Sequence, residues 1–177
     1  MPRFDESGLR VVPLNKDIDL SAFSCSEPQL NNFLMEDSLN DHENLYSITH
    51  LVLSGEEIAG FFTLITDNLS ISRLEKTAYQ DYHYQKLPAI KVARLATAKK
   101  FEGQGVGRRM IVEIYKYVYM ITKYAGCRLI TVDAKEDAVG FYQKFAFKIV
   151  SGKRNTPFVP MYLDFKPICD MIKDTLK

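Results

Sequence analysis

Runs of mostly apolar residues, separated by polar turns, mark the first strands along the chain. One run extends from Ile48 to Leu53 and the next from Ile58 to Ile65, and both are rich in β-branched and aromatic residues, which is typical of strands. The stretch from Ser54 to Glu57 between them contains a glycine and predicts a tight turn. Because the two runs are adjacent and joined by a short turn, we expect an antiparallel hairpin.

Apolar residues at helical spacing predict two further elements. A strong amphipathic helix is expected from about Val106 to Tyr124, ended by Gly126. Its apolar face is formed by Met110, Ile114, Val118 and Ile121. An earlier helix is expected to begin near Ser26, whose hydroxyl can cap it while Gln29 completes a capping box. The apolar face of that helix is formed by Leu30, Phe33 and Leu34.

Strands and helices alternate in the second half of the chain. Around the long helix, the expected strands are Ile90–Thr97, Arg128–Asp133, Phe147–Val150 and Pro160–Phe165, with a short helix over Glu136–Lys144. This order predicts an α/β fold, mixed α+β in character, with helices against a mixed central sheet. The polar segment from Asp67 to Leu87 predicts a substrate-side insertion or flap, partly helical around Arg73 to Tyr79.

The composition fits one compact domain spanning residues 1–177. Hydrophobic residues make up 46% and charged residues 25%, as in average globular proteins, and no shift in composition marks a linker. Neither the cysteines nor the histidines have the spacing of metal ligands, so we expect free thiols, ordinary packing or surface histidines, and no metal. These residues are Cys25, Cys127, Cys169, His42, His50 and His83.

Net charge and hydropathy restrict the partners. Lysine and arginine number 23 against 22 acidic residues, so the net charge of +1 provides no global attraction for nucleic acid, although a local basic patch stays open. No apolar stretch approaches the ~20 residues of a membrane span, and the polar, acidic N-terminus does not resemble a signal peptide. We expect a cytoplasmic protein that does not bind membranes.

The most informative stretch lies between the strand that ends at Thr97 and the long helix. It reads Lys100-Phe101-Glu102-Gly103-Gln104-Gly105-Val106-Gly107-Arg108-Arg109. Glycines allow positive φ angles and close approach of a ligand, and free amides at a helix start attract anions, so the loop predicts a phosphate or pyrophosphate site. The residues that complete a P-loop or a dinucleotide fingerprint are absent from the sequence. A simple chain reversal is the alternative.

This loop and its neighbours resemble the acyl-CoA site of the GNAT superfamily of N-acetyltransferases. The matching segments are Arg94-Leu95-Ala96-Thr97, Gln104-Gly105-Val106-Gly107 and Ala138-Val139-Gly140-Phe141-Tyr142, and the resemblance extends roughly from Phe23 to Phe165. Pro88-Ala89-Ile90 and the stretch Gly126–Ala134 look closest to the branch that includes toxin-type acetyltransferases. The resemblance implies a GNAT-like mixed sheet with two splayed parallel strands, flanked by helices.

The resemblance also implies acetyl-CoA as the acyl donor. Its pyrophosphate would lie on the backbone of Gly103, Gln104, Gly105, Val106, Gly107 and Arg108. The pantetheine arm would pair with the main chain of Leu95, Ala96 and Thr97, as an added strand does, and an amide of that strand would stabilise the developing oxyanion. Ala138 and Phe141 would pack along the cofactor.

Amine acylation needs a neutral amine and a proton for the leaving thiolate. By the resemblance Tyr142 supplies this proton, because a phenol with a pKa of ~10 stays protonated at pH 7; an ordinary packing tyrosine is the alternative. The strand Ile90–Thr97 carries no carboxylate, which excludes a glutamate base there. Asp67 is a candidate base that could equally cap a turn, and a water relay is the alternative. Arg94 alternates with Ala96, so we expect it on the core side of the sheet, paired there or in contact with the acceptor.

Three residues depart from the family pattern. Glu102 stands where glutamine or arginine is usual, Lys135 where asparagine is common, and Ala146 where glycine precedes the phenylalanine. An acid near phosphates is unfavourable unless its carboxylate turns away.

Three functions are compatible with these residues. The leading one is an acyl-CoA-dependent N-acyltransferase that moves acetyl from acetyl-CoA to a primary amine by direct attack. Toxin-like acetylation of the amino acid on charged tRNA is supported by the branch but disfavoured by the near-neutral charge; its basic patch would use Lys99, Lys100, Arg108, Arg109, Lys144, Lys148, Lys153 and Arg154. The third is a non-catalytic CoA-binding sensor. A homodimer is compatible with the superfamily.

Overall fold

The computed structural model describes residues 8–74, 79, 82–152 and 156–175, and every structural statement below concerns these residues. The chain divides into two compact units, the first made of residues 1–65 with 93–117 and the second of residues 66–92 with 118–177. Two strands and one helix, β3, β4 and α3, contribute residues to both units. The single domain over residues 1–177 stays a prediction.

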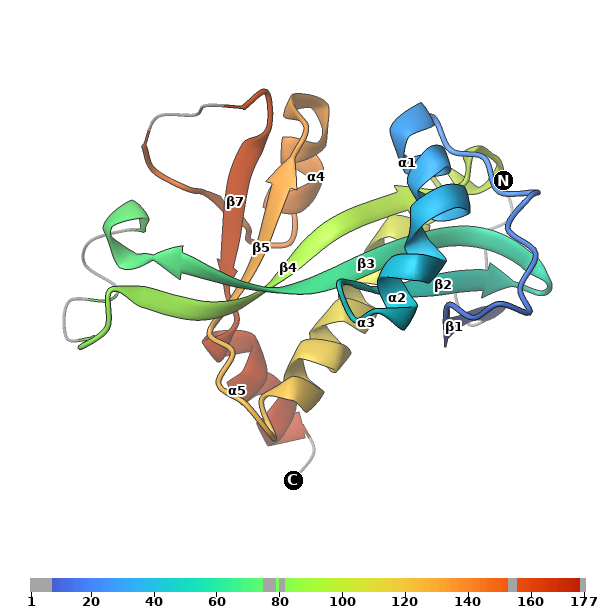
Figure 1. Cartoon of the computed structure of the whole chain (residues 1–177). Helices are drawn as coiled ribbons and strands as arrows, with labels where there is room; N and C mark the ends of the chain where they lie inside the picture. Colours follow the sequence, from blue (N-terminus) through green and yellow to red (C-terminus); the bar gives the residue numbers. More distant parts are fainter. Residues whose placement is uncertain (1–7, 75–78, 80–81, 153–155, 176–177) are drawn as a thin grey trace. The chain divides into compact units, whose positions relative to one another are not determined.

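The strands form one mixed sheet, as predicted. In the described part of the chain it has seven strands in the order β1-β2-β3-β4-β5-β7-β6 (Figure 1). Their bounds are β1 Leu9–Pro13, β2 Ile48–Ser54, β3 Glu57–Ser70, β4 Lys86–Thr97, β5 Leu129–Ala134, β6 Lys148–Ile149 and β7 Val159–Asp164. β4 and β5 run parallel, whereas β1–β2, β2–β3, β5–β7 and β6–β7 are antiparallel pairs.

The hairpin predicted from the apolar runs is confirmed in the first unit. β2 pairs with β3 from Ile48↔Leu64 to Ser54↔Glu57, and the turn between them contains Gly55 at a φ of 62°. The positive φ explains the glycine, because an L side chain is strained there. β1 adds to the free edge of β2 and was not predicted.

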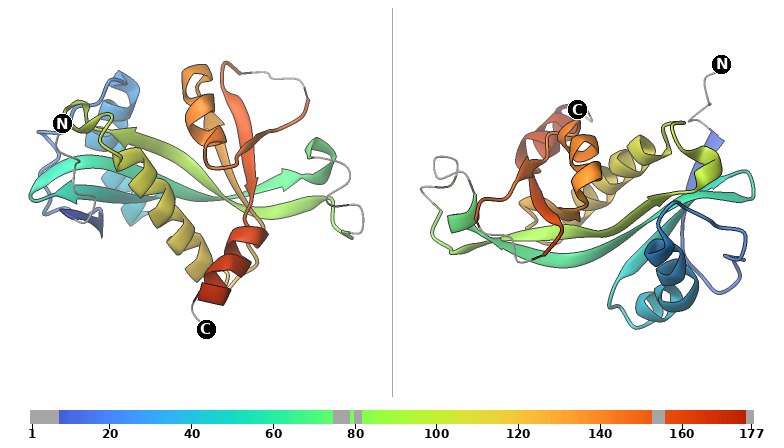
Figure 2. Two further views of the ribbon diagram at one scale, coloured as in Figure 1. Left: turned by 180° about the vertical axis from the view of Figure 1, so that it is seen from behind. Right: turned by 90° about the horizontal axis from the view of Figure 1, so that it is seen from above.

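Helices cover both faces of this hairpin. On one face lie α1 (Pro28–Asn32), the π-helical turn η2 (Phe33–Asp37) and α2 (Ser38–Glu43); on the other lies the part of α3 (Val106–Ile121) that belongs to this unit (Figure 2). The ring of Phe61 packs against that of Phe33 with 6.3 Å between centroids, and Met110 of α3 is fully buried. The apolar stripe predicted for α3 therefore faces the core, and the helix ends at Ile121 rather than Tyr124.

The predicted cap at Ser26 is wrong. The cap residue of α1 is Glu27, which makes no side-chain hydrogen bond to the helix, and a proline occupies the first turn. Proline has a preset φ and lacks the N–H that a cap would satisfy, so Pro28 starts the helix by itself. The hydroxyl of Ser26 instead donates to Glu102 Oε1 at 2.8 Å.

In the second unit β5 lies between β4 and β7. Its parallel pairing with β4 is registered from Ala89↔Leu129 to Val92↔Val132. The short helix α4 (Val139–Gln143) follows the 3₁₀ turn η5 (Glu136–Ala138), and α5 (Lys166–Thr175), which was not predicted, follows β7. The apolar cluster of this unit comprises Leu69, Leu74, Tyr79, Leu87, Ala89, Leu129, Val150 and Tyr162. Among the described helices none is both long and apolar enough to cross a membrane.

The segment Asp67–Leu87 is not a separate flap at its described ends. β3 continues to Ser70 and β4 already begins at Lys86, so the two ends extend the sheet. The 3₁₀ turn η3 (Ile71–Arg73) follows β3, and Ile71 N–H donates to the carbonyl oxygen of Gln85 at 2.9 Å. The helix predicted around Arg73 to Tyr79 falls mostly on residues outside the described ranges. The backbone N–H and C=O groups of these ends are paired in the sheet, although their side chains are polar. The polar side chains are the reason why the sequence did not predict strands here.

Candidate functional site

The glycine loop joins the end of β4 to the start of α3, all within the first unit. After the 3₁₀ turn η4 (Lys99–Phe101) the chain reaches Gly103 at a φ of 72° and Gly105 at a φ of 86°. Both angles lie in the left-handed region, so glycine is required by conformation; a Cβ on Gly103 would meet nothing within 4 Å. Because Gly103 has no side chain and open space beside it, another molecule can approach the backbone closely there.

The start of α3 presents amide groups. Arg109 N–H donates to the carbonyl oxygen of Gly105 at 3.0 Å, which is the first bond of the helical ladder. The amides of Val106, Gly107 and Arg108 precede this bond, and such amides attract anions at the positive end of the helix dipole. The site fits a phosphate-bearing ligand.

Charged side chains next to the loop are Glu102, Arg108 and Arg109. The carboxylate of Glu102 accepts the Ser26 hydroxyl, so this family departure is held by a partner of its own. Arg108 is exposed beside the loop, and Arg109, whose Nη2 lies 2.8 Å from Glu113 Oε1, keeps a buried Nε without a partner among the described residues. Arg108 is thus an exposed cation next to the loop, Arg109 is paired with Glu113, and the Glu102 carboxylate is engaged by Ser26.

β4 is held closely against β3 just before the loop. A Cβ built on Gly60 of β3 would lie only 2.7 Å from the carbonyl oxygen of Ala96, and Ala98 N–H donates to Ala59 at 2.9 Å. Successive residues of a strand direct their amides to opposite edges. The main chains of Leu95 and Thr97 therefore face the edge of β4 away from β3.

Tyr142 lies on α4 in the second unit. Its side chain is buried, and its ring meets those of Phe141 and Phe147 edge-on at 5.1 and 5.4 Å. Burial raises the pKa of the Tyr142 phenol, because the charged phenolate loses its hydration. The hydroxyl is therefore protonated at neutral pH and can donate a proton. Ala138 and Phe141 are half-buried in the same segment.

The turn after α4 contains Ala146, which stands where the family pattern has glycine. Ala146 has a φ of 63°, in the region where glycine is the unstrained residue. Its N–H donates to Gln143 at 3.0 Å, and Phe147 N–H donates to Tyr142 at 3.3 Å, so this turn closes directly on the carbonyl oxygen of Tyr142.

Comparison with known proteins agrees with these features. Residues 47–149 match the acetyltransferase (GNAT) domain family. The chain belongs to this family. It is therefore an acetyltransferase, and the predicted resemblance to the GNAT superfamily is confirmed.

The similar proteins include toxins. This GNAT domain is 25% identical over 146 residues to a tRNA-acetylating toxin of Mycobacterium tuberculosis, covering 82% of this chain and 84% of that protein. A structure of AtaT complexed with acetyl-methionyl-tRNAfMet superposes with a TM-score of 0.85 at 23% identity, covering 93% of this chain and 99% of that one. A mutant of KacT superposes with a TM-score of 0.82 at 25% identity, with the same coverage. The predicted closeness to the toxin-type branch is thus confirmed.

Asp67 of this GNAT domain has neighbours that the sequence did not reveal. Its Oδ2 accepts a hydrogen bond of 2.6 Å from the hydroxyl of Thr131. Close by in the sheet, Lys91 Nζ lies 2.5 Å from Asp133 Oδ2. Lys91 and Thr131 are also register partners in the β4–β5 pair, so these polar side chains gather on one part of the sheet. The alternation of Thr131 and Asp133 along β5 was the available signal. Asp67 as general base stays a prediction.

Arg94 is not on the core side, contrary to expectation. It is exposed, with its guanidinium 4.9 Å from the ring centroid of Phe33 and its Nη1 donating to the carbonyl oxygen of Ala93 at 2.8 Å. A long arginine covers apolar surface with its stem while its charged head stays in water, so alternation with a buried alanine did not require burial.

Some of the basic residues expected to form a tRNA-binding patch are engaged in ion pairs. Lys100 Nζ contacts both carboxylate oxygens of Glu57 at 2.6 Å, and Arg109 pairs with Glu113. Lys153 and Arg154 fall outside the described residues.

Gly60 is the residue next to the candidate site that sequence reasoning missed, although an isolated glycine inside an apolar strand is a signal of close backbone approach.

Proposed function

We propose that this GNAT domain transfers the acetyl group of acetyl-CoA to the α-amino group of an amino acid esterified to tRNA. One observation carries the proposal: the likeness to a tRNA-acetylating toxin extends over 82% of the chain. The likeness to AtaT, solved with acetyl-methionyl-tRNAfMet, supports the same class of acceptor. These relatives outweigh the argument from the net charge of +1, which had disfavoured an RNA substrate.

The glycine loop is proposed to hold the pyrophosphate of acetyl-CoA. The amides of Val106, Gly107 and Arg108, with the left-handed turns at Gly103 and Gly105, supply the donors and the room that this group needs. A structure of AtaTR bound with acetyl-CoA superposes on this chain with a TM-score of 0.78, which supports the same donor. Gln104 completes the loop, since its Nε2 donates to the carbonyl oxygen of Lys100 at 2.7 Å.

The pantetheine arm is proposed to pair with β4. The main chains of Leu95 and Thr97 face away from β3, so they supply strand-like donors and acceptors, while Ala96 faces β3. Ala138 and Phe141, half-buried beside Tyr142, are proposed to pack against the donor. Family membership supports each of these two assignments.

Tyr142 is proposed as the general acid. The acceptor nitrogen bonds to the acetyl carbon and the carbon–sulfur bond breaks; the amine gives its proton to solvent or a base, and the Tyr142 hydroxyl gives its proton to the thiolate. Tyr142 then regains a proton from water. An α-amino group with a pKa of ~7.7–8.0 is substantially neutral at physiological pH, so it needs less help from a base than a lysine does.

The sensor alternative loses its main support. That hypothesis rested on Glu102 and Lys135, and the Glu102 carboxylate is hydrogen-bonded to Ser26. Charged tRNA is a cytoplasmic substrate, so the proposal agrees with the expected cytoplasmic location. Two structures of similar fold contain AtaT with the C-terminus of the antitoxin AtaR, so we also propose that a partner protein restrains the activity.

An acetylation assay with labelled acetyl-CoA tests the proposal. The acceptors are a panel of aminoacyl-tRNAs, the same tRNAs deacylated, and small amines; the variants are Tyr142→Phe and, as a matched control, Tyr46→Phe at an exposed tyrosine. We expect label only on charged tRNA and a loss of about 10²-fold or more in kcat for Tyr142→Phe alone. Equal transfer to small amines would overturn the tRNA acceptor. Binding of acetyl-CoA with no transfer to any acceptor would restore the sensor.

A further inference from the structure

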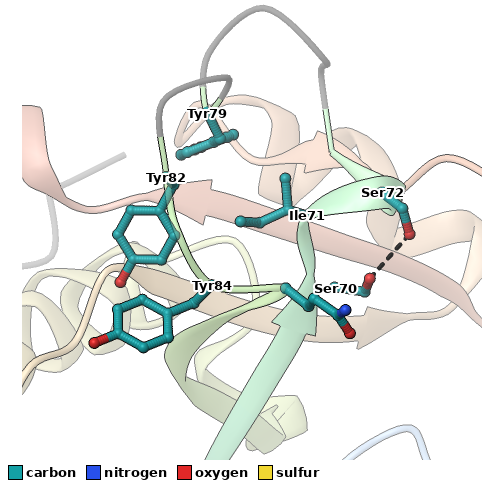
Figure 3. Close-up of a pocket in the computed structure, with 7 residues that line it drawn as sticks. Ser70, Ile71, Ser72, Tyr79, Tyr82 and Tyr84 are labelled. Carbon is teal, nitrogen blue, oxygen red and sulfur yellow. Dashed lines mark hydrogen bonds between the residues drawn. The ribbon is translucent and has the colours of Figure 1, made fainter.

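A surface pocket lies in the second unit, where β3 ends and β4 begins. It has a volume of about 540 Å³, within the ~300–1,000 Å³ typical of ligand pockets. Its lining includes Ser70, Ser72, Tyr79, Tyr82, Tyr84 and Gln85 (Figure 3). None of these residues belongs to the proposed acetyl-CoA site.

Two exposed aromatic rings distinguish this pocket. Tyr82 is 41% exposed and Tyr84 is 70% exposed, and their ring centroids lie 5.5 Å apart. Figure 3 shows the two rings projecting to the same side, with their hydroxyls directed away from the strands. Exposed large rings that lie together on a soluble protein are characteristic of binding surfaces.

The third tyrosine is fixed in place. Tyr79 is buried, its hydroxyl donates to Asp164 Oδ2 at 2.9 Å, and the guanidinium of Arg128 lies 5.3 Å from the centroid of its ring. Arg128 in turn forms two hydrogen bonds of 2.7 Å with the Asp164 carboxylate. The wall formed by Tyr79 is therefore rigid, which lowers the cost of ordering when a ligand binds.

Polar side chains line the same pocket as the rings. The Ser70 and Ser72 hydroxyls lie 2.9 Å apart, and the side chain of Gln85 supplies both a donor and an acceptor. Arg73 and Lys86, next to lining residues in the sequence, are exposed and positive, while the carboxylate of Asp164 behind Tyr79 is paired with Arg128. The described lining thus suits a ligand with a flat ring and hydrogen-bonding edges, and the two cations favour a negative charge on it.

We propose that this pocket, with Tyr82 and Tyr84 at its mouth, binds an unpaired nucleotide of the RNA acceptor. The base stacks on the tyrosine rings, its edge contacts the serine hydroxyls and Gln85, and its phosphate faces Arg73 or Lys86. The inference rests on the proposed function. Proteins bind unpaired nucleotides largely through aromatic stacking, which does not require a strongly basic surface. That suits a chain with a net charge of +1.

A binding assay without acetyl transfer tests the pocket itself. The probe is a short unpaired oligoribonucleotide with a 2-aminopurine base, whose fluorescence falls when it stacks on an aromatic ring. We expect quenching by the wild-type protein and by the pair Tyr82→Phe and Tyr84→Phe, which keeps both rings. The pair Tyr82→Ala and Tyr84→Ala should lose about 10- to 100-fold in affinity, the range for removing a base–aromatic stack. Tyr124→Ala, at a tyrosine that is 87% exposed, is the matched control and should bind as the wild type does.

Acetylation kinetics then separate this inference from the proposed function. With charged tRNA the alanine pair should raise KM by a similar factor and leave kcat unchanged, while transfer to a small aminoacyl ester, where it is detectable, should not change. Wild-type affinity of the alanine pair for the oligonucleotide would overturn the pocket even if tRNA is acetylated. Quenching without acetylation of any charged tRNA would keep the pocket and refute the proposed function. Dissociation of a dimer in the alanine pair, seen by sedimentation with no loss of RNA binding, would assign the surface to self-association instead.

Discussion

Ala146 has a backbone conformation that glycine adopts without strain, so we expect Ala146→Gly to stabilise the protein. Its φ is 63°, where an L side chain costs about 1–2 kcal/mol. Glycine also increases the conformational entropy of the unfolded chain, which lowers the free energy of unfolding by about 0.4–1 kcal/mol and offsets part of the gain from removing the strain. The side chain is exposed, so little buried area is lost. The net gain should be about 0.5–1 kcal/mol, or about 1–4 °C in Tm for a chain of this length.

Urea denaturation measures this gain as a shift of the midpoint at constant slope. The matched control is Ala125→Gly, because Ala125 is also exposed and lies in the same unit but is not among the described residues with positive φ. That variant should lose about 0.4–1 kcal/mol, since only the unfolded chain gains freedom. If both variants lower the midpoint by the same amount, the strain assigned to Ala146 does not exist.

The same variant examines how α4 is held. The turn at Ala146 closes on Tyr142 through the hydrogen bond from Phe147 N–H, and the ring of Phe147 lies 5.4 Å from that of Tyr142. Relief of strain at a conformation that glycine already prefers leaves these contacts in place. We therefore expect kcat to be unchanged while stability rises, and a fall in kcat would mean that the strained turn contributes to the position of Tyr142.

Three further predictions concern the first unit. Gly60→Ala should cost about 1–3 kcal/mol in urea denaturation and raise the KM for acetyl-CoA, because its Cβ would displace the Ala96 carbonyl; a neutral effect on both would refute the close approach. Burial lowers the pKa of His50 to about 4, so the unfolded chain, with a histidine pKa of ~6.5, takes up the proton first as the pH falls. Stability should therefore decline by up to about 3 kcal/mol between pH 6.5 and pH 4, and His50→Phe should remove that part of the decline. Glu102→Gln should lower the KM for acetyl-CoA by about two- to fivefold, whereas Ser26→Ala, which releases the Glu102 carboxylate, should raise it; the same KM in both would exclude a charge effect.

Elements with a clear apolar pattern could be predicted from the sequence. The β2–β3 hairpin is buried on both faces, so its strands appear as continuous apolar runs, whereas helix α3 has an apolar stripe that appears as helical spacing. The glycine loop could be predicted because positive φ angles restrict the residue type, and both Gly103 and Gly105 have such angles. These features depend on the spacing and the conformational preferences of residues close together in the chain, so a single sequence is sufficient to predict them.

Elements that depend on a neighbour could not be predicted. β1 buries only Leu9 and ends in Pro13, which an edge strand tolerates because one side of it needs no partner. α5 is only ten residues long and buries only Cys169 among them. The extension of β3 to Ser70 alternates exposed polar residues with few buried ones, and it is stabilised by pairing rather than by its own composition. In each case the decisive contacts come from residues distant in sequence.

Ser26 and Glu102 show how two separate errors of interpretation have one cause. Ser26 was expected to cap a helix because serine often does so, and Glu102 was expected to oppose phosphate because its charge is negative. In the structure the Ser26 hydroxyl donates a hydrogen bond of 2.8 Å to the Glu102 carboxylate, so Ser26 does not cap the helix and the carboxylate has a partner. The two residues are 76 positions apart, and no local pattern connects them. A departure from a family pattern at a binding loop is therefore weak grounds against function until the partner of the departing residue is known.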